Sequence, residues 1–219
     1  MRFAFFTLLV LAACKPPAKP VDQGPVTLHI VAMNDFHGAL YEQPMKGSDK
    51  AIGGLPWLAG AVDALRADHP DLLLLDAGDL FQGSWPVNAT EGRGSVEAEN
   101  LLGVDAAAVG NHDFDYGPIE GDDSLRGALK AGAKLAKFQW LTANVFHEDG
   151  TRWEPEGIAP WTMLERKGRK IAVIGLTTTD TPETTLKKNV ADLRFEDVVQ
   201  AVQDILTEVN AAQDRKSVV

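Results

Sequence analysis

GNHDFD, residues Gly110–Asp115, is the stretch of this 219-residue chain that decides the fold and points to its chemistry. It follows a run of small or apolar residues, 106–110, which predicts a narrow strand buried on both faces. An amide, an imidazole and two carboxylates then arrive within residues 111–115. Because open α/β sheets hold their ligands beyond the carboxyl ends of the strands, the pattern predicts a functional site at this point.

Two earlier predicted strands end in the same way. NDFHG, residues Asn34–Gly38, follows the first strand, Val26–Ala32, and Asp79 follows the leucine-rich strand Asp71–Asp76. Asp, His and Asn side chains therefore follow three successive strands. Since the carboxyl ends of parallel strands meet at one edge of a sheet, these side chains are expected to lie together.

The other expected elements come from hydrophobic periodicity. Helices are expected at residues 55–68, 94–102, 125–137 and 195–212, a strand at 140–145, and a hairpin of strands at 161–166 and 170–176. This alternation of strands and helices predicts one α/β domain. Residues 217–219 start what reads as a further strand.

Composition and charge narrow the class of protein. Hydrophobic residues make up 45% of the chain, which is enough for one sizeable core. The formal net charge of −10 becomes −11 without Arg2, because 20 basic residues then face 31 acidic ones. Nucleic acid is therefore not expected as a partner. An acidic protein can still bind phosphate where metal ions supply the positive charge.

The N-terminus has the features of an export signal. Phe3–Leu11 is apolar but too short to span a bilayer, and small residues precede Cys14. The segment resembles a bacterial lipoprotein signal, which implies a signal peptide at 1–13, a lipid on Cys14 and a location at the cell envelope, facing the periplasm or the exterior. The alternative is a leader with an incidental cysteine. Residues 14–25 are rich in proline and predict an extended tether, so the folded domain is expected at 26–219.

Ligand type and position predict a metal site. Asp35 and His37 are two residues apart, Asp79 comes from the next strand and Asn111 from the one after. Carboxylate, imidazole and amide groups suit Mn, Fe, Co, Zn or Mg. Two divalent ions about 3.5–4 Å apart would clamp a phosphoryl group and acidify a water that attacks phosphorus in line.

His112 and Asp115 are the candidate catalytic residues. His112 directly follows Asn111, so its side chain diverges from that ligand and is better placed over a substrate. It is expected to donate a proton or hydrogen bond to the transferring oxygens, with Asp115 orienting its ring. Taken singly, an Asn-His pair is usually a turn, but the ordered set after three strands favours catalysis.

The remaining histidines receive structural roles. His29 is expected to pack in the middle of the first strand, and His69 is expected at the end of a helix, where a cation is favoured. His147 is expected to be a solvated loop residue.

Together the motifs resemble the calcineurin-like metallophosphoesterases, and within them the secreted 5′-nucleotidase and UDP-sugar hydrolase group. The matching segments are NDFHG at 34–38, GDLFQGS at 78–84, GNHDFDYG at 110–117, LTANV at 141–145 and IGLTT at 174–178. The resemblance implies a layered α-β-β-α sandwich and the hydrolysis of a nucleotide to a nucleoside and phosphate. It also implies individual roles: first-ion ligands Asp35 and His37, bridging ligand Asp79, second-ion ligand Asn111, and transition-state stabilisation by His112 with Asp115.

The chain departs from the pattern of that family after residue 147. The family has further metal-binding histidines in a Ser-His-x-Gly-like and a Gly-His-x-His motif, then a nucleoside-binding domain, but no histidine follows His147 here. The sandwich is therefore expected to be incomplete at its C-terminal end, as the N-terminal part of a larger enzyme, and to hydrolyse little by itself. The alternative is a non-catalytic remnant that holds one ion weakly. The metal and the preference between nucleotide and sugar nucleotide stay open.

Overall fold

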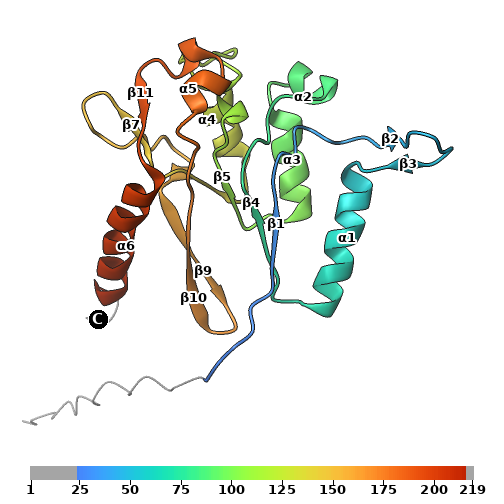
Figure 1. Ribbon diagram of the computed structural model, residues 1–219, viewed down its shortest axis with the longest axis horizontal. Helices are drawn as coiled ribbons and strands as arrows, with labels where there is room; N and C mark the ends of the chain where they lie inside the picture. Colours follow the sequence, from blue (N-terminus) through green and yellow to red (C-terminus); the bar gives the residue numbers. More distant parts are fainter. Residues whose placement is uncertain (1–23, 216–219) are drawn as a thin grey trace, which may run out of the picture.

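A five-stranded parallel sheet forms the centre of the computed structural model, which describes residues 24–215 (Figure 1). Its strand order is β1-β4-β5-β6-β8. The strands are β1 (Ile30–Met33), β4 (Leu73–Asp76), β5 (Ala106–Ala108), β6 (Gln139–Leu141) and β8 (Ile158–Ala159). The expected signal peptide, Cys14, most of the tether and the strand at 217–219 lie outside the described residues.

Helices and a hairpin cover the two faces of this sheet. One face carries α1 (Leu55–Asp68), α3 (Arg93–Leu102) and α4 (Gly127–Leu135). The opposite face of the sheet packs against the antiparallel hairpin of β9 (Trp161–Arg166) and β10 (Arg169–Ile174). Helix α6 (Val198–Arg215) lies on the outer side of this hairpin (Figure 1). The layers thus follow the predicted order of helix, sheet, sheet and helix.

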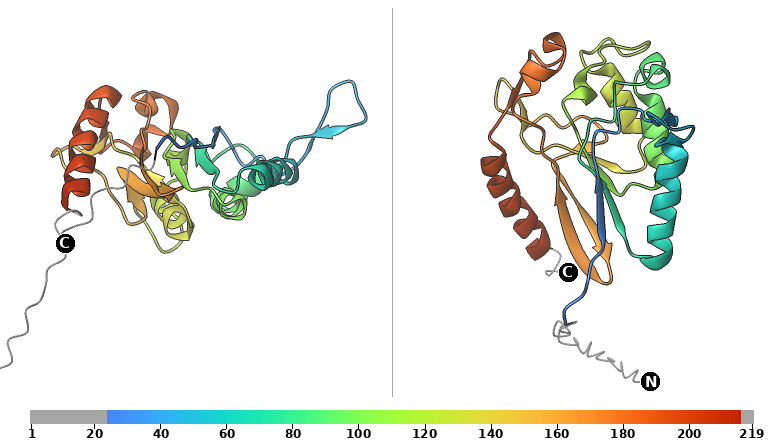
Figure 2. Two further views of the ribbon diagram at one scale, coloured as in Figure 1. Left: turned by 90° about the horizontal axis from the view of Figure 1, so that it is seen from below. Right: turned by 45° about the vertical axis from the view of Figure 1, so that its right-hand side comes forward.

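Short elements complete the described part of the chain. They are β2 (Gln43–Pro44), β3 (Ala51–Ile52), α2 (Trp85–Ala89), the 3-10 helix η1 (His112–Phe114), β7 (Val145–His147), α5 (Thr181–Thr184), the 3-10 helix η2 (Lys187–Asn189) and β11 (Leu193–Phe195). The β2–β3 hairpin projects from the body of the molecule (Figure 2, left). No helix within residues 24–215 is long and apolar enough to cross a bilayer.

The main core lies between the sheet and its helices. Phe81, Phe114 and Trp140 are completely buried there, and the rings of Phe81 and Trp140 meet edge to face with centroids 5.5 Å apart. A smaller cluster joins Ile205 and Val209 of α6 to the β9–β10 hairpin. The main core therefore fixes the strand ends from which the predicted site residues project.

The strand predicted at 140–145 is interrupted: residues 140–141 lie in β6 and Val145 begins β7, but the residues between them form no strand. Asn144 lies at the break and bonds to two distant segments. Its amide donates to the carbonyl groups of Thr177 and Glu196 and accepts the N–H of Thr177. The backbone at the break is bonded as well, because the N–H groups of Thr142 and Ala143 donate to the carbonyl oxygens of Ala159 and Gly175.

Several predicted boundaries also differ from the structure. The helix expected from residue 195 begins at Val198, because Phe195 ends β11 and Asp197 accepts two N–H groups of the first helical turn. The first strand begins at Ile30 instead of Val26.

His29 and His69 stack on each other at the end of the sheet opposite the loops of the predicted site. Their ring centroids are 3.6 Å apart and their planes differ by 12°. The expected mid-strand position of His29 is wrong, because His29 precedes β1, whereas His69 does end α1. Burial lowers the pKa of His29 below 6.5, and the nearby charges of His69 and Lys167 lower it further.

We expect this pair to make the fold sensitive to mild acid. The folded protein binds a proton on His29 less tightly than the unfolded chain does. His29 therefore leaves the free energy of unfolding unchanged well above pH 6.5 and lowers it as the pH falls below that value. In His29→Asn, the difference between the urea unfolding midpoints at about pH 5.5 and about pH 7.5 should therefore be smaller than in wild type. His147→Asn is the control, and an unchanged pH dependence in His29→Asn would contradict the expectation.

Candidate metal centre

The loops that follow β1, β4 and β5 meet at one edge of the sheet. The backbone N–H groups of Asp35 and His37 donate to the carbonyl oxygens of Gly78 and Asp79, each at 3.0 Å. The N–H of His112 donates to the carboxylate of Asp79 at 2.8 Å. Hydrogen bonds thus join the three loops directly.

Side chains from all three loops converge at this edge. His37, Asp79 and His112 each offer one ligand atom, and these atoms lie within 4.8 Å of one another. Asp35 adjoins them, with its Oδ1 3.6 Å from Nε2 of His37. Asn111 is half-buried and lies in the loop after β5, directly before His112, the first residue of η1.

Hydrogen bonds fix the tautomers of both histidines. Nδ1–H of His37 donates to the carbonyl oxygen of Phe81 at 3.1 Å. Because a carbonyl oxygen can only accept, Nε2 of His37 keeps its lone pair for a ligand. Nδ1–H of His112 likewise donates to Oδ2 of Asp115 at 2.6 Å, which leaves its own Nε2 available.

The surrounding charges change the acidity of His112. Partial burial acts to lower its pKa, but the hydrogen bond to Asp115 and the charges of Asp115, Asp79 and Asp113 outweigh burial and raise the pKa above 6.5. The ring therefore stays protonated to a higher pH than a free histidine. A protonated ring can donate from both nitrogens.

Asp113, to which the sequence pattern assigned no role, anchors the loop that carries Asp79. It is completely buried, and its carboxylate accepts four backbone N–H groups. The donors are Gly110 at 2.8 Å, Leu80 at 2.9 Å, Phe81 at 3.0 Å and Asp79 at 3.2 Å. Asp113 therefore ties the β4 loop to the β5 loop. Three of its partners are backbone groups more than 30 residues away, which sequence spacing does not reveal; its place directly beside the Asn-His pair was the only signal.

The backbone of these loops is strained. Asp35, His37, Asp79 and Gln82 have φ values of 52°, 46°, 63° and 65°, which non-glycine residues rarely adopt. Each such residue costs about 1–2 kcal/mol, and such strain clusters at functional sites. The loops also approach very closely, because a Cβ on Gly78 would lie 2.6 Å from the backbone nitrogen of Gly110.

The donor set fits a divalent cation. Within residues 24–215, neither Asp35 nor Asp79 forms an ion pair with a lysine or arginine. Burial raises the pKa of the neighbouring Asp76 to about 7 against the opposing hydrogen bond from Gly78, and the charges of Asp35 and Asp79 add to the rise. A cation would relieve this accumulation of negative charge, and imidazole with carboxylate suits the borderline divalent metals.

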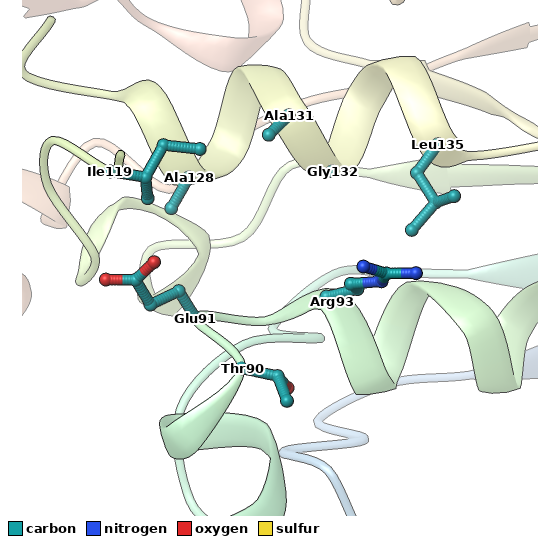
Figure 3. Close-up of a pocket in the computed structure, with 8 residues that line it drawn as sticks. All are labelled: Thr90, Glu91, Arg93, Ile119, Ala128, Ala131, Gly132 and Leu135. Atoms are coloured by element: carbon teal, nitrogen blue, oxygen red, sulfur yellow. The ribbon is translucent and has the colours of Figure 1, made fainter. Parts of the chain in front are cut away.

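A separate cavity of about 470 Å³ lies between the turn at residues 90–93 and α4 (Figure 3). Ile119, Ala128 and Leu135 give it mainly apolar walls, while Glu91 and Arg93 line the opposite side. None of the six predicted site residues lines it. This cavity is therefore distinct from the candidate metal centre.

Comparison with known families identifies the class of protein. Residues 28–210 match the family described as calcineurin-like phosphoesterase. The chain therefore belongs to the calcineurin-like phosphoesterases, a family of hydrolases that use divalent metals, with which the cluster of His37, Asp79 and His112 is compatible. The predicted family, the α/β fold class and the membership of a family of enzymes are confirmed.

Its relatives include 5′-nucleotidases. It is 36% identical over 202 residues to the snake venom 5′-nucleotidase of Gloydius brevicauda, covering 90% of this chain and 33% of the relative. It is 34% identical over 209 residues to the 5′-nucleotidase of Rattus norvegicus, covering 92% and 34%. The crystal structure of a 5′-nucleotidase precursor from Thermus thermophilus aligns with a TM-score of 0.70 and 30% identity, covering 85% and 35%. The chain spans about a third of the length of these relatives.

Proposed function

We propose that this protein is a metal-dependent phosphoester hydrolase of the 5′-nucleotidase type, which converts a nucleotide to a nucleoside and phosphate. The observation that carries the proposal is the convergence of His37, Asp79 and His112 within 4.8 Å at one edge of the sheet. The 5′-nucleotidase relatives support the substrate class. Because the chain spans only about a third of them, its own activity is part of the proposal.

The proposed cofactor is a pair of divalent ions, Mn, Zn, Co, Fe or Mg. Asp35 and His37 would hold one ion, Asn111 the other, and Asp79 would be shared. When bound, such ions neutralise phosphate charge and lower the pKa of water. Asn111 suits this site because its amide adds no negative charge where an anionic substrate must bind.

His112 and Asp115 are the proposed catalytic pair. Asp115 accepts Nδ1–H of His112, and in the protonated ring Nε2 can also donate a hydrogen bond to the phosphoryl oxygens of the substrate. The raised pKa of His112 favours this protonated form of the ring. The positive charge of the protonated ring stabilises the extra negative charge that develops on the phosphoryl oxygens during phosphoryl transfer.

The proposed location rests on the N-terminal sequence. We assign residues 1–13 to an export signal, a lipid anchor to Cys14 and an extended tether to residues 14–25, which would hold the phosphoesterase domain from residue 26 at the outer side of a bacterial membrane. Nucleotides or other phosphoesters are the proposed partners, whereas the acidic net charge of −10 disfavours nucleic acid.

Asp79→Asn tests the proposal with a neutral side chain of the same shape. Wild type should bind Mn²⁺ in calorimetry and release phosphate from AMP or an aryl phosphate, although slowly, and Asp79→Asn should reduce both by about 100-fold because it removes the shared carboxylate. Asp63→Asn on the exposed face of α1 is the control and should match wild type.

The outcomes separate the two interpretations. Mn²⁺-dependent phosphate release that Asp79→Asn reduces about 100-fold supports a hydrolase. Mn²⁺ binding without phosphate release favours the alternative, a non-catalytic module that holds metal. Equal Mn²⁺ binding by wild type and Asp79→Asn would contradict the metal centre itself.

A further inference from the structure

Asp115 has a second side-chain partner in addition to His112. Its Oδ2 accepts Nδ1–H of His112 at 2.6 Å, and its Oδ1 accepts the hydroxyl of Thr185 at 2.7 Å. The Asp115 side chain is only 19% exposed, so water reaches the carboxylate poorly. The two oxygens of Asp115 are therefore held by two different side chains, and Thr185 lies 70 positions away along the chain.

We infer that Thr185 is a positioning residue that acts on His112 through Asp115, an inference that rests on the proposed function. The terminal torsion of an aspartate is broad, so one hydrogen bond to His112 leaves the carboxylate free to rotate. The hydroxyl of Thr185 removes that freedom. The imidazole is then held in one orientation, with Nε2 directed away from Asp115.

The backbone around Thr185 keeps its hydroxyl in place. Thr185 directly follows α5, and its N–H donates to the carbonyl oxygen of Thr181 at 3.0 Å. Thr181 is completely buried, and its own hydroxyl donates to the carbonyl oxygen of Thr178 at 2.7 Å. Because threonine is branched at Cβ, its side chain has few rotamers once the backbone is set.

A second set of contacts joins this segment to the turn that carries His112. The amide of buried Asn189 donates to the carbonyl oxygens of Phe114 at 2.8 Å and Asp115 at 3.2 Å. Arg126 donates in turn to the carbonyl oxygen of Asn189 at 2.7 Å and pairs with Asp192. Asn189 thus holds the backbone of the turn, whereas Thr185 holds the side chain of Asp115.

The test removes the hydroxyl without changing side-chain shape. In Thr185→Val, the nitrogen and proton NMR signals of the His112 ring should shift, and the low-field Nδ1 proton should exchange faster with water. The turnover number with AMP should fall about tenfold with little change in KM, because the ring is misoriented in the transition state. Thr185→Ser keeps the hydroxyl, so its His112 signals and its turnover number should match those of wild type.

Thr184→Val is the matched control. Its hydroxyl donates to the carbonyl oxygen of Asp180 and not to Asp115, so the His112 signals should stay unchanged. Unchanged His112 signals in Thr185→Val would overturn the inference, whatever the activity. The expected signal changes in a protein that releases no phosphate would support the positioning role of Thr185 and count against the hydrolase proposal alone.

Discussion

Replacing Asp113 with alanine will lower the free energy of unfolding by about 3–5 kcal/mol. The carboxylate of Asp113 accepts four backbone N–H groups, and the side chain is completely buried. Alanine leaves these donors without a partner, and each unsatisfied buried donor costs about 1–3 kcal/mol, partly recovered by relaxation or water. The β4 loop should then lose the conformation that presents Asp79.

Urea unfolding followed by circular dichroism measures this effect. Asp149→Ala is the control, because Asp149 also accepts the N–H and hydroxyl of Thr151 but lies in an exposed turn. It should lose less than about 1 kcal/mol, since water replaces the bonds. A loss in Asp113→Ala no larger than that of Asp149→Ala would show that Asp113 does not hold the loops.

Replacing Glu99 with glutamine will stabilise the protein, and the gain will grow with pH. Glu99 of α3 is completely buried, and none of the residues at 24–215 forms a hydrogen bond with either of its carboxyl oxygens. Burial raises its pKa from 4.5 to about 9, and the charges of Asp76 and Asp113 add to the rise.

The sign of this pH dependence follows from proton uptake. The folded state keeps Glu99 protonated, whereas the unfolded chain releases the proton above pH 4.5, so this residue destabilises the fold progressively between pH 4.5 and about 9. The cost is up to about 1.4 kcal/mol per pH unit. Glutamine resembles the protonated acid and carries no such cost. The gain should thus be below about 1 kcal/mol at pH 5 and about 2–4 kcal/mol at pH 8.

Unfolding free energies at these two pH values test the prediction for Glu99. Glu97→Gln on the exposed face of the same helix is the matched control, since Glu97 is 51% exposed and paired with Arg93. Its effect should stay below about 1 kcal/mol at both pH values. A gain for Glu99→Gln that is equal at pH 5 and pH 8 would mean that Glu99 is not protonated in the folded protein.

The layers of the fold were predictable, but not all element boundaries. Strands at the second and third motifs, the β9–β10 hairpin and helix α1 follow from periodicity, because their burial is set by local sequence. The break after β6 contains Asn144, whose partners Thr177 and Glu196 lie 33 and 52 residues away. A sequence window cannot contain partners at that distance.

The candidate site divides in the same way. Asp35, His37, Asp79 and His112 could be found because each follows a strand that ends at the same edge of the sheet. Asp113 and Thr185 could not be given roles, since one bonds to distant backbone groups and the other arrives from a segment 70 residues beyond Asp115. Groups that support a site rely on tertiary contacts more than the groups that form it.

The left-handed backbone at Asp35, His37 and Asp79 sets a conflict for anyone who redesigns this protein. Glycine would be more comfortable at all three positions, yet glycine brings no ligand atom. Selection for thermal stability alone would therefore favour sequences that remove the ligand atoms. This edge of the sheet would then lose its backbone strain together with its function.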